Sequence, residues 1–266
     1  MKTLLNDMYK IQYSNEVRNG QNKYAVCQCF SKCKTCDFDY DSSFICNKSL
    51  KLGEWYERAK IKVLFIGKED VSRNTEDILR PASFSDVKNQ HYIGTKHILA
   101  ALLGYCSADD ITNYRNKEIH FKEEEHLHKQ FALTNHYHCA FKNKSQEGKN
   151  HGIRVSDSMW KNCASIVRNE IEILQPDVVV IQAGWSAKRK MPSKTRVKDV
   201  EFYFDKEKWT VTENDDIFGL YEAYNKETGR TCCIIGSYHP SFHKWNEEEY
   251  LCPLKARVKK VKEILE

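Results

Sequence analysis

The chain has 266 residues and a formal net charge of +5, with 41% hydrophobic and 30% charged residues. This balance is typical of a soluble globular protein, and the length favours one sizeable α/β domain with insertions. No apolar run approaches the roughly 18 residues that a membrane-spanning helix needs, and residues 1–7 turn polar too early for a signal peptide. We therefore expect a cytoplasmic protein that does not contact a membrane.

Cysteines are concentrated near the start of the chain. Of the 11 cysteines, five fall within 20 residues, at Cys27, Cys29, Cys33, Cys36 and Cys46. A C-x-x-C spacing lets two thiolates reach one metal from a tight turn. In a chain without an export signal, such a group favours a metal or iron–sulfur site over disulfides. We interpret residues 1–50 as a cysteine-rich arm, and a local zinc module is one alternative, formed by Cys29, Cys33, Cys36 and Cys46.

The next part of the chain predicts two buried strands and a helix. The apolar run at residues 61–67 is typical of a buried strand that ends at Gly67, and Glu69 and Asp70 follow directly. A helix is predicted over residues 95–103 and a second strand over 131–135. Carboxylates at the carboxyl end of a buried strand lie where open α/β sheets bind ligands. Acids that cap a helix from a solvated loop are the alternative.

The rest of the chain alternates in the same way. Residues 156–174 predict a helix with one apolar face, 178–181 a third buried strand, 220–224 and 231–235 a hairpin, and 254–265 a basic helix. Residues 188–198 hold only basic charges, a composition that binds phosphates but also occurs in solvated loops. Pro240 restricts His239 to an extended backbone, which holds the imidazole; a plain strand-ending turn is the alternative. Strands that alternate with helices predict an α/β sandwich with a largely parallel sheet.

Seven short motifs follow one another in the chain: Cys33-Lys34-Thr35-Cys36, Ile66-Gly67-Lys68-Glu69-Asp70, Tyr92-Ile93-Gly94, Thr134-Asn135 with Cys139, Cys163 with Pro176, Ala183-Gly184-Trp185-Ser186-Ala187, and Tyr238-His239-Pro240-Ser241. In this order and spacing they resemble the uracil-DNA glycosylase superfamily, closest to its iron–sulfur branch, often called family 4. The resemblance leaves out residues 104–130 and 188–218, which look like insertions. It implies a three-layer α/β/α sandwich around a central, mostly parallel four-stranded sheet over residues 51–266.

The resemblance also implies an activity. A DNA glycosylase flips a base out of the duplex and hydrolyses its N-glycosidic bond, which leaves an abasic site. By resemblance, His239 would donate a hydrogen bond to the departing base anion. Glu69 or Asp70 would stabilise the sugar cation or orient the attacking water. Asn135 would hydrogen-bond the edge of the base, and Tyr92 would stack on its face.

Other matching positions imply contacts with DNA and with a metal cluster. Gly67 and Val71 belong to the loop beside the base, and Phe242 would wedge into the gap that the flipped nucleotide leaves. The residues expected to hold phosphates are Ser241, Lys188, Arg189 and Lys190. A 4Fe–4S cluster, or zinc as the alternative, would be held by Cys33, Cys36, Cys139 and Cys163. The expected partner is DNA, bound by a monomer.

The first loop departs from the family pattern. Asp70-Val71 stands where members usually carry Pro-Gly, so either Glu69 or Asp70 can face the sugar. In the uracil-selective branch, a tyrosine at the position of Val71 excludes a 5-methyl group, and the shorter Val71 leaves room there. Uracil and a 5-substituted pyrimidine, for instance in foreign or phage DNA, both remain open as the excised base. A non-catalytic nucleic-acid-binding relative is the alternative function.

Overall fold

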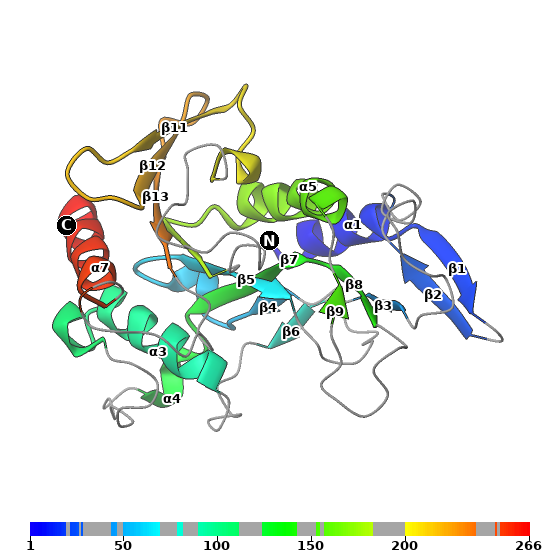
Figure 1. Ribbon diagram of the computed structural model, residues 1–266, viewed down its shortest axis with the longest axis horizontal. Coiled ribbons are helices and arrows are strands. Elements are labelled where there is room, and N and C mark those ends of the chain that lie inside the picture. The colour runs from blue at the N-terminus through cyan, green and yellow to red at the C-terminus, as the bar shows by residue number, and fades with distance from the viewer. Residues whose placement is uncertain are drawn as a thin grey trace.

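The computed structural model describes residues 1–19, 22–26, 28, 44–46, 50–69, 79–81, 90–111, 124–142, 153–154, 157–182, 200–237, 248 and 251–266. Its largest feature is a twisted sheet that runs through the middle of the molecule, with helices on both faces (Figure 1). None of the helices in these ranges is both long and apolar enough to cross a membrane.

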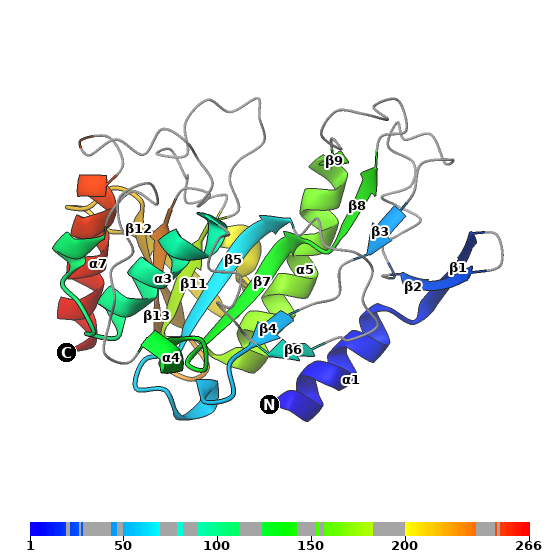
Figure 2. The ribbon, with the colours of Figure 1, turned by 90° about the horizontal axis from the view of Figure 1, so that it is seen from below.

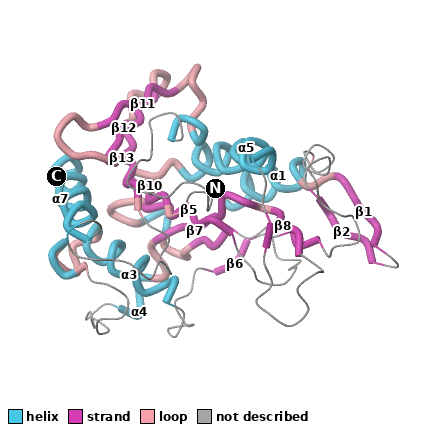
Figure 3. The backbone as a smooth tube through the Cα atoms, in the orientation of Figure 1, coloured by secondary structure: helices cyan, strands magenta, loops and turns pink. Residues whose placement is uncertain are grey.

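The large sheet has eight strands. Their order across the sheet is β11 (Trp209–Glu213), β12 (Leu220–Asn225), β13 (Thr231–Gly236), β10 (Val178–Ile181), β5 (Val63–Glu69), β7 (Phe131–Tyr137), β4 (Leu50–Leu52) and β6 (Leu79–Pro81). β13, β10, β5 and β7 are parallel neighbours. β12 and β4 run antiparallel to them on the two sides. The prediction of a four-stranded sheet is therefore wrong in number, because β11 and β12 on one side and β4 and β6 on the other extend the parallel centre into a mixed sheet. Strands are drawn in magenta in Figure 3.

The four parallel strands form where the sequence predicted buried strands. Their apolar runs are continuous because both faces of the sheet are covered. All residues of β10 are buried, and so are those of β5 from Val63 to Gly67. The predicted hairpin is confirmed, since β12 and β13 pair antiparallel from Leu220 with Ile235 to Tyr224 with Thr231. In its turn the Asn225 side chain accepts from the backbone N–H of Glu227 at 2.9 Å.

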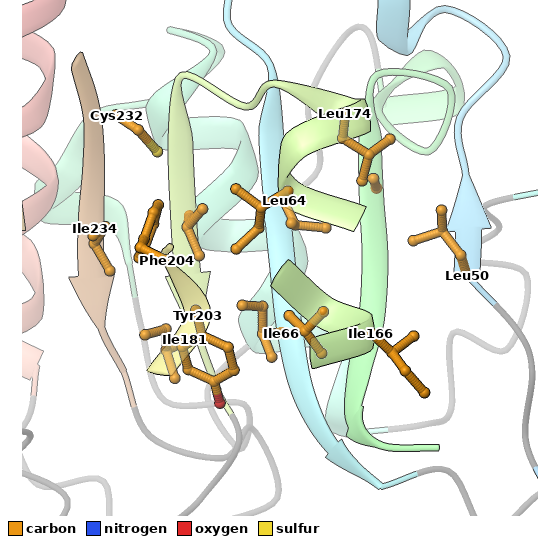
Figure 4. Packing of buried hydrophobic residues seen from close by; sticks show 14 of the residues in the cluster. Leu50, Leu64, Ile66, Ile166, Leu174, Ile181, Tyr203, Phe204, Cys232 and Ile234 are labelled. Carbon is orange, nitrogen blue, oxygen red and sulfur yellow. The ribbon is translucent and has the colours of Figure 1, made fainter. Parts of the chain in front are cut away.

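Helices cover the two faces separately (Figures 1 and 2). α3 (Gln90–Leu102) and α7 (Cys252–Leu265) pack with Val63 and Phe65 of β5 in one apolar cluster. α1 (Lys2–Gln12) and α5 (Asp157–Leu174) pack with Leu64 and Ile66 in the other, part of which Figure 4 shows. Successive residues of a strand point to opposite faces, so each central strand divides its side chains between the two clusters.

Short elements connect this framework. They are the single turns η1 (Tyr56–Arg58), η2 (Ala108–Asp110), α4 (Glu124–Leu127) and η5 (Glu201–Tyr203). β1 (Asn15–Asn19) and β2 (Asn22–Val26) form a hairpin after α1. A small antiparallel sheet joins β3 (Phe44–Cys46), β8 (Cys139–Lys142) and β9 (Ile153–Arg154). Because β8 follows β7 directly, this sheet attaches part of the N-terminal arm to the carboxyl side of the large sheet (Figure 2).

Candidate functional site

The carboxyl ends of β13 and β10 lie level with one another, and β5 and β7 run further, to Glu69 and Tyr137. Ile181 of β10 pairs with Gly236 on one side and with Ile66 on the other. Gly67 in turn pairs with Asn135 of β7. The backbone N–H of Gln182 donates to the Ile66 carbonyl at 2.7 Å, and that of Ser237 to the Ile181 carbonyl at 2.9 Å. One row, Ser237, Gln182, Gly67 and Asn135, therefore crosses the edge where open α/β sheets bind ligands.

The four residues of this carboxyl-edge row lie on the face of the sheet that α3 and α7 cover. Each stands two positions after a residue of that face's apolar cluster, namely Ile235, Val180, Phe65 and Leu133. Strand residues two apart share a face. Gly67, Gln182 and Ser237 are buried, and Asn135 is partly exposed. On this face of the sheet, the apolar cluster is thus followed at the carboxyl edge by a row that includes polar residues.

Gly67 makes room for the Asn135 side chain. A methyl group at Gly67 would lie 2.5 Å from Asn135 Oδ1, far inside van der Waals contact. The amide of Asn135 therefore lies over Gly67 of β5, in space that only glycine leaves. An amide offers both a donor and an acceptor, which is what recognition of a base edge requires. This contact brings two of the predicted base-binding residues together.

α3 reaches the same edge with its N-terminal half. The Thr95 hydroxyl donates to Gln182 Oε1 at 3.0 Å, and both side chains are buried. Tyr92, predicted to stack on a base, lies in α3 three residues before Thr95. The side chain of Tyr92 lies outside the described part of the structure, so its stacking role stays a prediction.

The predicted catalytic groups are placed only through their neighbours in the chain. Glu69 is the last residue of β5, where its backbone pairs with Tyr137; its side chain is not among those described. Asp70, Val71, His239, Ser241 and Phe242 lie outside the described residues. His239 follows the row residue Ser237 by two positions. The roles proposed for these residues therefore stay predictions.

The basic segment is placed in the same way. Lys188, Arg189 and Lys190 lie outside the described residues. They fall between Gln182, at the carboxyl end of β10, and Val200, which is buried beside η5.

The Arg257 side chain of α7 holds the end of β13, the strand that precedes His239 in the chain. Buried Arg257 donates from Nη1 to the Gly236 carbonyl at 2.7 Å and from Nε to the Phe218 carbonyl at 2.7 Å. Gly219 lies against the guanidinium group, where a Cβ would come within 2.8 Å of it. The end of β13 is thereby fixed to α7 by a charged group.

The predicted cluster ligands are partly located. Cys163 is buried in α5, and β9, which precedes α5, pairs with β8, where Cys139 lies. Cys46 of β3 is the register partner of Cys139. Cys33 and Cys36 are not among the described residues. Within the described side chains, no three His, Cys, Asp or Glu residues are grouped so that they could hold a metal ion.

A buried polar cluster on the opposite face of β7 was missed by sequence reasoning. Glu170 of α5 accepts a hydrogen bond from the Tyr9 hydroxyl of α1, and its Oε1 lies 3.7 Å from His138 Nε2. Burial raises the pKa of Glu170 from 4.5 to about 7, although the hydroxyls of Thr134 and Tyr9 oppose the shift. The signal was present, because Glu170 falls on the apolar face of its helix.

The same face also fixes the strand that carries Asn135. The Tyr203 hydroxyl and His136 Nδ1 lie at hydrogen-bonding distance, 2.8 Å, and both side chains are buried. Tyr203 belongs to η5, which follows the basic segment in the chain, and its side chain is drawn in Figure 4. β7 is thus held by polar contacts on one face while its other face presents Asn135.

A comparison with known protein families covers the part of the chain that forms the carboxyl-edge row. The sequence profile of the Uracil DNA glycosylase superfamily matches residues 55–265, from before β5 to the end of α7. The chain therefore belongs to this superfamily, whose members are generally DNA N-glycosylases. A search of curated proteins gave no match. The family match includes the whole carboxyl-edge row and the segments that carry the predicted catalytic residues.

Proposed function

We propose that the protein is a DNA glycosylase that flips a base out of DNA and hydrolyses its N-glycosidic bond. The observation that carries the proposal is the Asn135 amide lying over Gly67, in a polar row at the carboxyl edge of a sheet that belongs to this superfamily. The proposed base is uracil or a 5-substituted pyrimidine, with Val71 leaving room for the substituent. In this proposal the enzyme acts on DNA in the cytoplasm as a monomer.

The reaction breaks the bond between C1′ of the sugar and the ring nitrogen of the base. The electron pair of that bond leaves with the base, and the oxygen of a water molecule then joins C1′. Glu69 or Asp70 would stabilise the positive sugar or take the proton of that water. His239 would donate a hydrogen bond to the base as it becomes an anion. Glu69 is the last residue of β5, Asp70 comes next, and His239 follows the end of β13, which favours one shared pocket.

Binding would use the remaining predicted residues. Asn135 would hydrogen-bond the base edge while Tyr92 stacks on its face, and Phe242 would fill the vacated space in the duplex. Phosphate contacts would come from Ser241, Lys188, Arg189 and Lys190. Since β10 ends at the row and the basic segment follows it, phosphate contacts there would lie beside the base site.

We further propose that Cys33, Cys36, Cys139 and Cys163 hold a 4Fe–4S cluster. Two features support it: Cys163 is buried in α5, and β9, just before α5, pairs with the strand of Cys139. Such a cluster would supply no chemistry to base excision but would join the arm to the sheet, because thiolate–metal bonds contribute folding energy. Zinc is the alternative metal.

The test is an abasic-site assay on oligonucleotides that contain uracil, thymine or other 5-substituted pyrimidines. We expect cleavable abasic sites from at least one base. His239→Ala should lower the excision rate about a hundred- to a thousand-fold, the usual effect of one preorganised donor, while DNA binding is retained. His126→Ala is the matched control, because His126 stacks on Trp55 at the far end of β7.

Two outcomes would contradict the proposal. Full excision by His239→Ala would remove that residue from the chemistry. DNA binding with no excision from any base would instead favour a non-catalytic relative, for which the altered Asp70-Val71 loop already provides a reason.

A further inference from the structure

Gln182 is the central polar residue of the carboxyl-edge row. It follows β10, between the strand that leads to His239 and β5, the strand that contains Gly67. Its side chain is fully buried on the face that α3 covers. No role has been given to it in the proposed reaction, yet its two neighbours along the row, Ser237 and Gly67, adjoin the predicted catalytic segments.

The amide of Gln182 is only half satisfied. Thr95 donates to Oε1 at 3.0 Å. Nε2 is buried as well, and none of the described residues accepts a hydrogen bond from it. A buried donor without an acceptor costs free energy, and an apolar side chain of the same size would avoid that cost. The amide of Gln130, by contrast, donates to the Tyr105 hydroxyl at 2.9 Å.

We propose that Gln182 is a binding residue of the base site, whose Nε2 donates a hydrogen bond to an oxygen atom of the flipped base. This inference rests on the proposed glycosylase function. Thr95 is a positioning residue, because its donated hydrogen bond holds Oε1 and leaves the NH₂ end for the ligand. Asn135 and Gln182 then present two amides on either side of Gly67, on the same face of the sheet.

The ligand atom is a carbonyl oxygen of the pyrimidine ring or an oxygen of a 5-substituent. Both accept a hydrogen bond from an amide, and they are separated by comparing bases. A ring carbonyl is present in uracil, thymine and 5-hydroxymethyluracil alike, whereas an oxygen at the 5-position is present only in the last. Gln182 thus discriminates among these bases only if it contacts the substituent.

The test compares Gln182→Leu and Thr95→Val with the matched control Gln130→Leu, which removes a partnered amide near the opposite end of β7. We expect Gln182→Leu to fold and to unfold close to the wild-type temperature, since it removes the unpaired Nε2 donor together with the acceptor of the buried Thr95 hydroxyl. Its kcat/KM should fall about tenfold, the effect of one hydrogen bond, while its affinity for DNA with a ready-made abasic site stays unchanged. Thr95→Val should show the same pattern of bases with a smaller loss.

The readings of the assay are distinct. An equal loss for all three bases identifies the ring carbonyl, and a loss confined to 5-hydroxymethyluracil identifies the substituent oxygen. Wild-type excision rates in Gln182→Leu for every base, or its failure to fold, overturn the inference and leave the glycosylase function standing. If the wild type excises nothing, the proposed function fails. In that case the inference about Gln182 is tested by binding to oligonucleotides with 2′-fluoro nucleotides. Gln182→Leu must still weaken the preference of the protein for DNA that contains the base over DNA with an abasic site.

Discussion

Replacing Gly67 with alanine should disable base recognition while leaving the fold intact. The new methyl group would lie 2.5 Å from Asn135 Oδ1, so the amide must rotate away; the Thr134 carbonyl, at 3.6 Å, need not move. The clash falls on the end of a flexible side chain, and a strained rotamer costs only about 0.5–1.5 kcal/mol. An asparagine that pairs with a base contributes about 1–3 kcal/mol to discrimination, so kcat/KM should fall roughly five- to 150-fold.

The assay is single-turnover excision with Gly67→Ala, Asn135→Ala and the double variant, with thermal unfolding measured on each. If Gly67→Ala acts by displacing the Asn135 amide, the two effects must not add, and the double variant should match Asn135→Ala. The reasoning would be refuted by additive losses, because Gly67 would then act without Asn135. It would also be refuted by wild-type excision in Gly67→Ala, or by loss of the folded state in that variant.

Other expected outcomes concern stability, the cluster and DNA binding. Burial raises the pKa of Glu170 from 4.5 to about 7, so the folded protein binds this proton more tightly than the unfolded chain. Its free energy of unfolding should therefore fall by about 3 kcal/mol as the pH rises from 4.5 through 7, and urea titrations of Glu170→Gln should lack that fall. Arg257→Leu leaves the Gly236 and Phe218 carbonyls without their donor and should lower the free energy of unfolding by about 3 kcal/mol; an unchanged urea midpoint would contradict this. Cys163→Ser should give colourless, poorly folded protein, and retained colour that is lost in Cys46→Ser would move the metal to the arm. Neutralising Lys188, Arg189 and Lys190 should flatten the salt dependence of DNA binding by about 0.7–0.9 log units per lost contact. An unaltered salt dependence would mean that the segment is a solvated loop that does not contact phosphates.

Local sequence determined the parallel centre of the fold. Continuous apolar runs such as that of β10 are needed wherever both faces of a strand are covered. The sequence of one strand is therefore enough to predict that it is buried on both faces. The same logic placed the approach to His239 at a strand end, since a polar residue directly after a buried run marks the edge of the sheet. It ended the second predicted strand too early, because β7 continues past Asn135 to Tyr137. The prediction missed β4, β6 and β11 at the two sides of the sheet, because short strands such as β4 and β6 join it through backbone pairing rather than through periodicity.

Tertiary structure decided which of these residues meet. β10 follows β7 in the chain but inserts between β13 and β5 in the sheet, and only this order puts Gln182 at the centre of the polar row. The unmatched amide of Gln182, the contact of Asn135 with Gly67 and the pairing of Cys46 with Cys139 all depend on strand register. Where no short turn joins two strands, their register depends on how their buried faces pack against segments far apart in the chain, so the partner of a given residue is not read from its own strand.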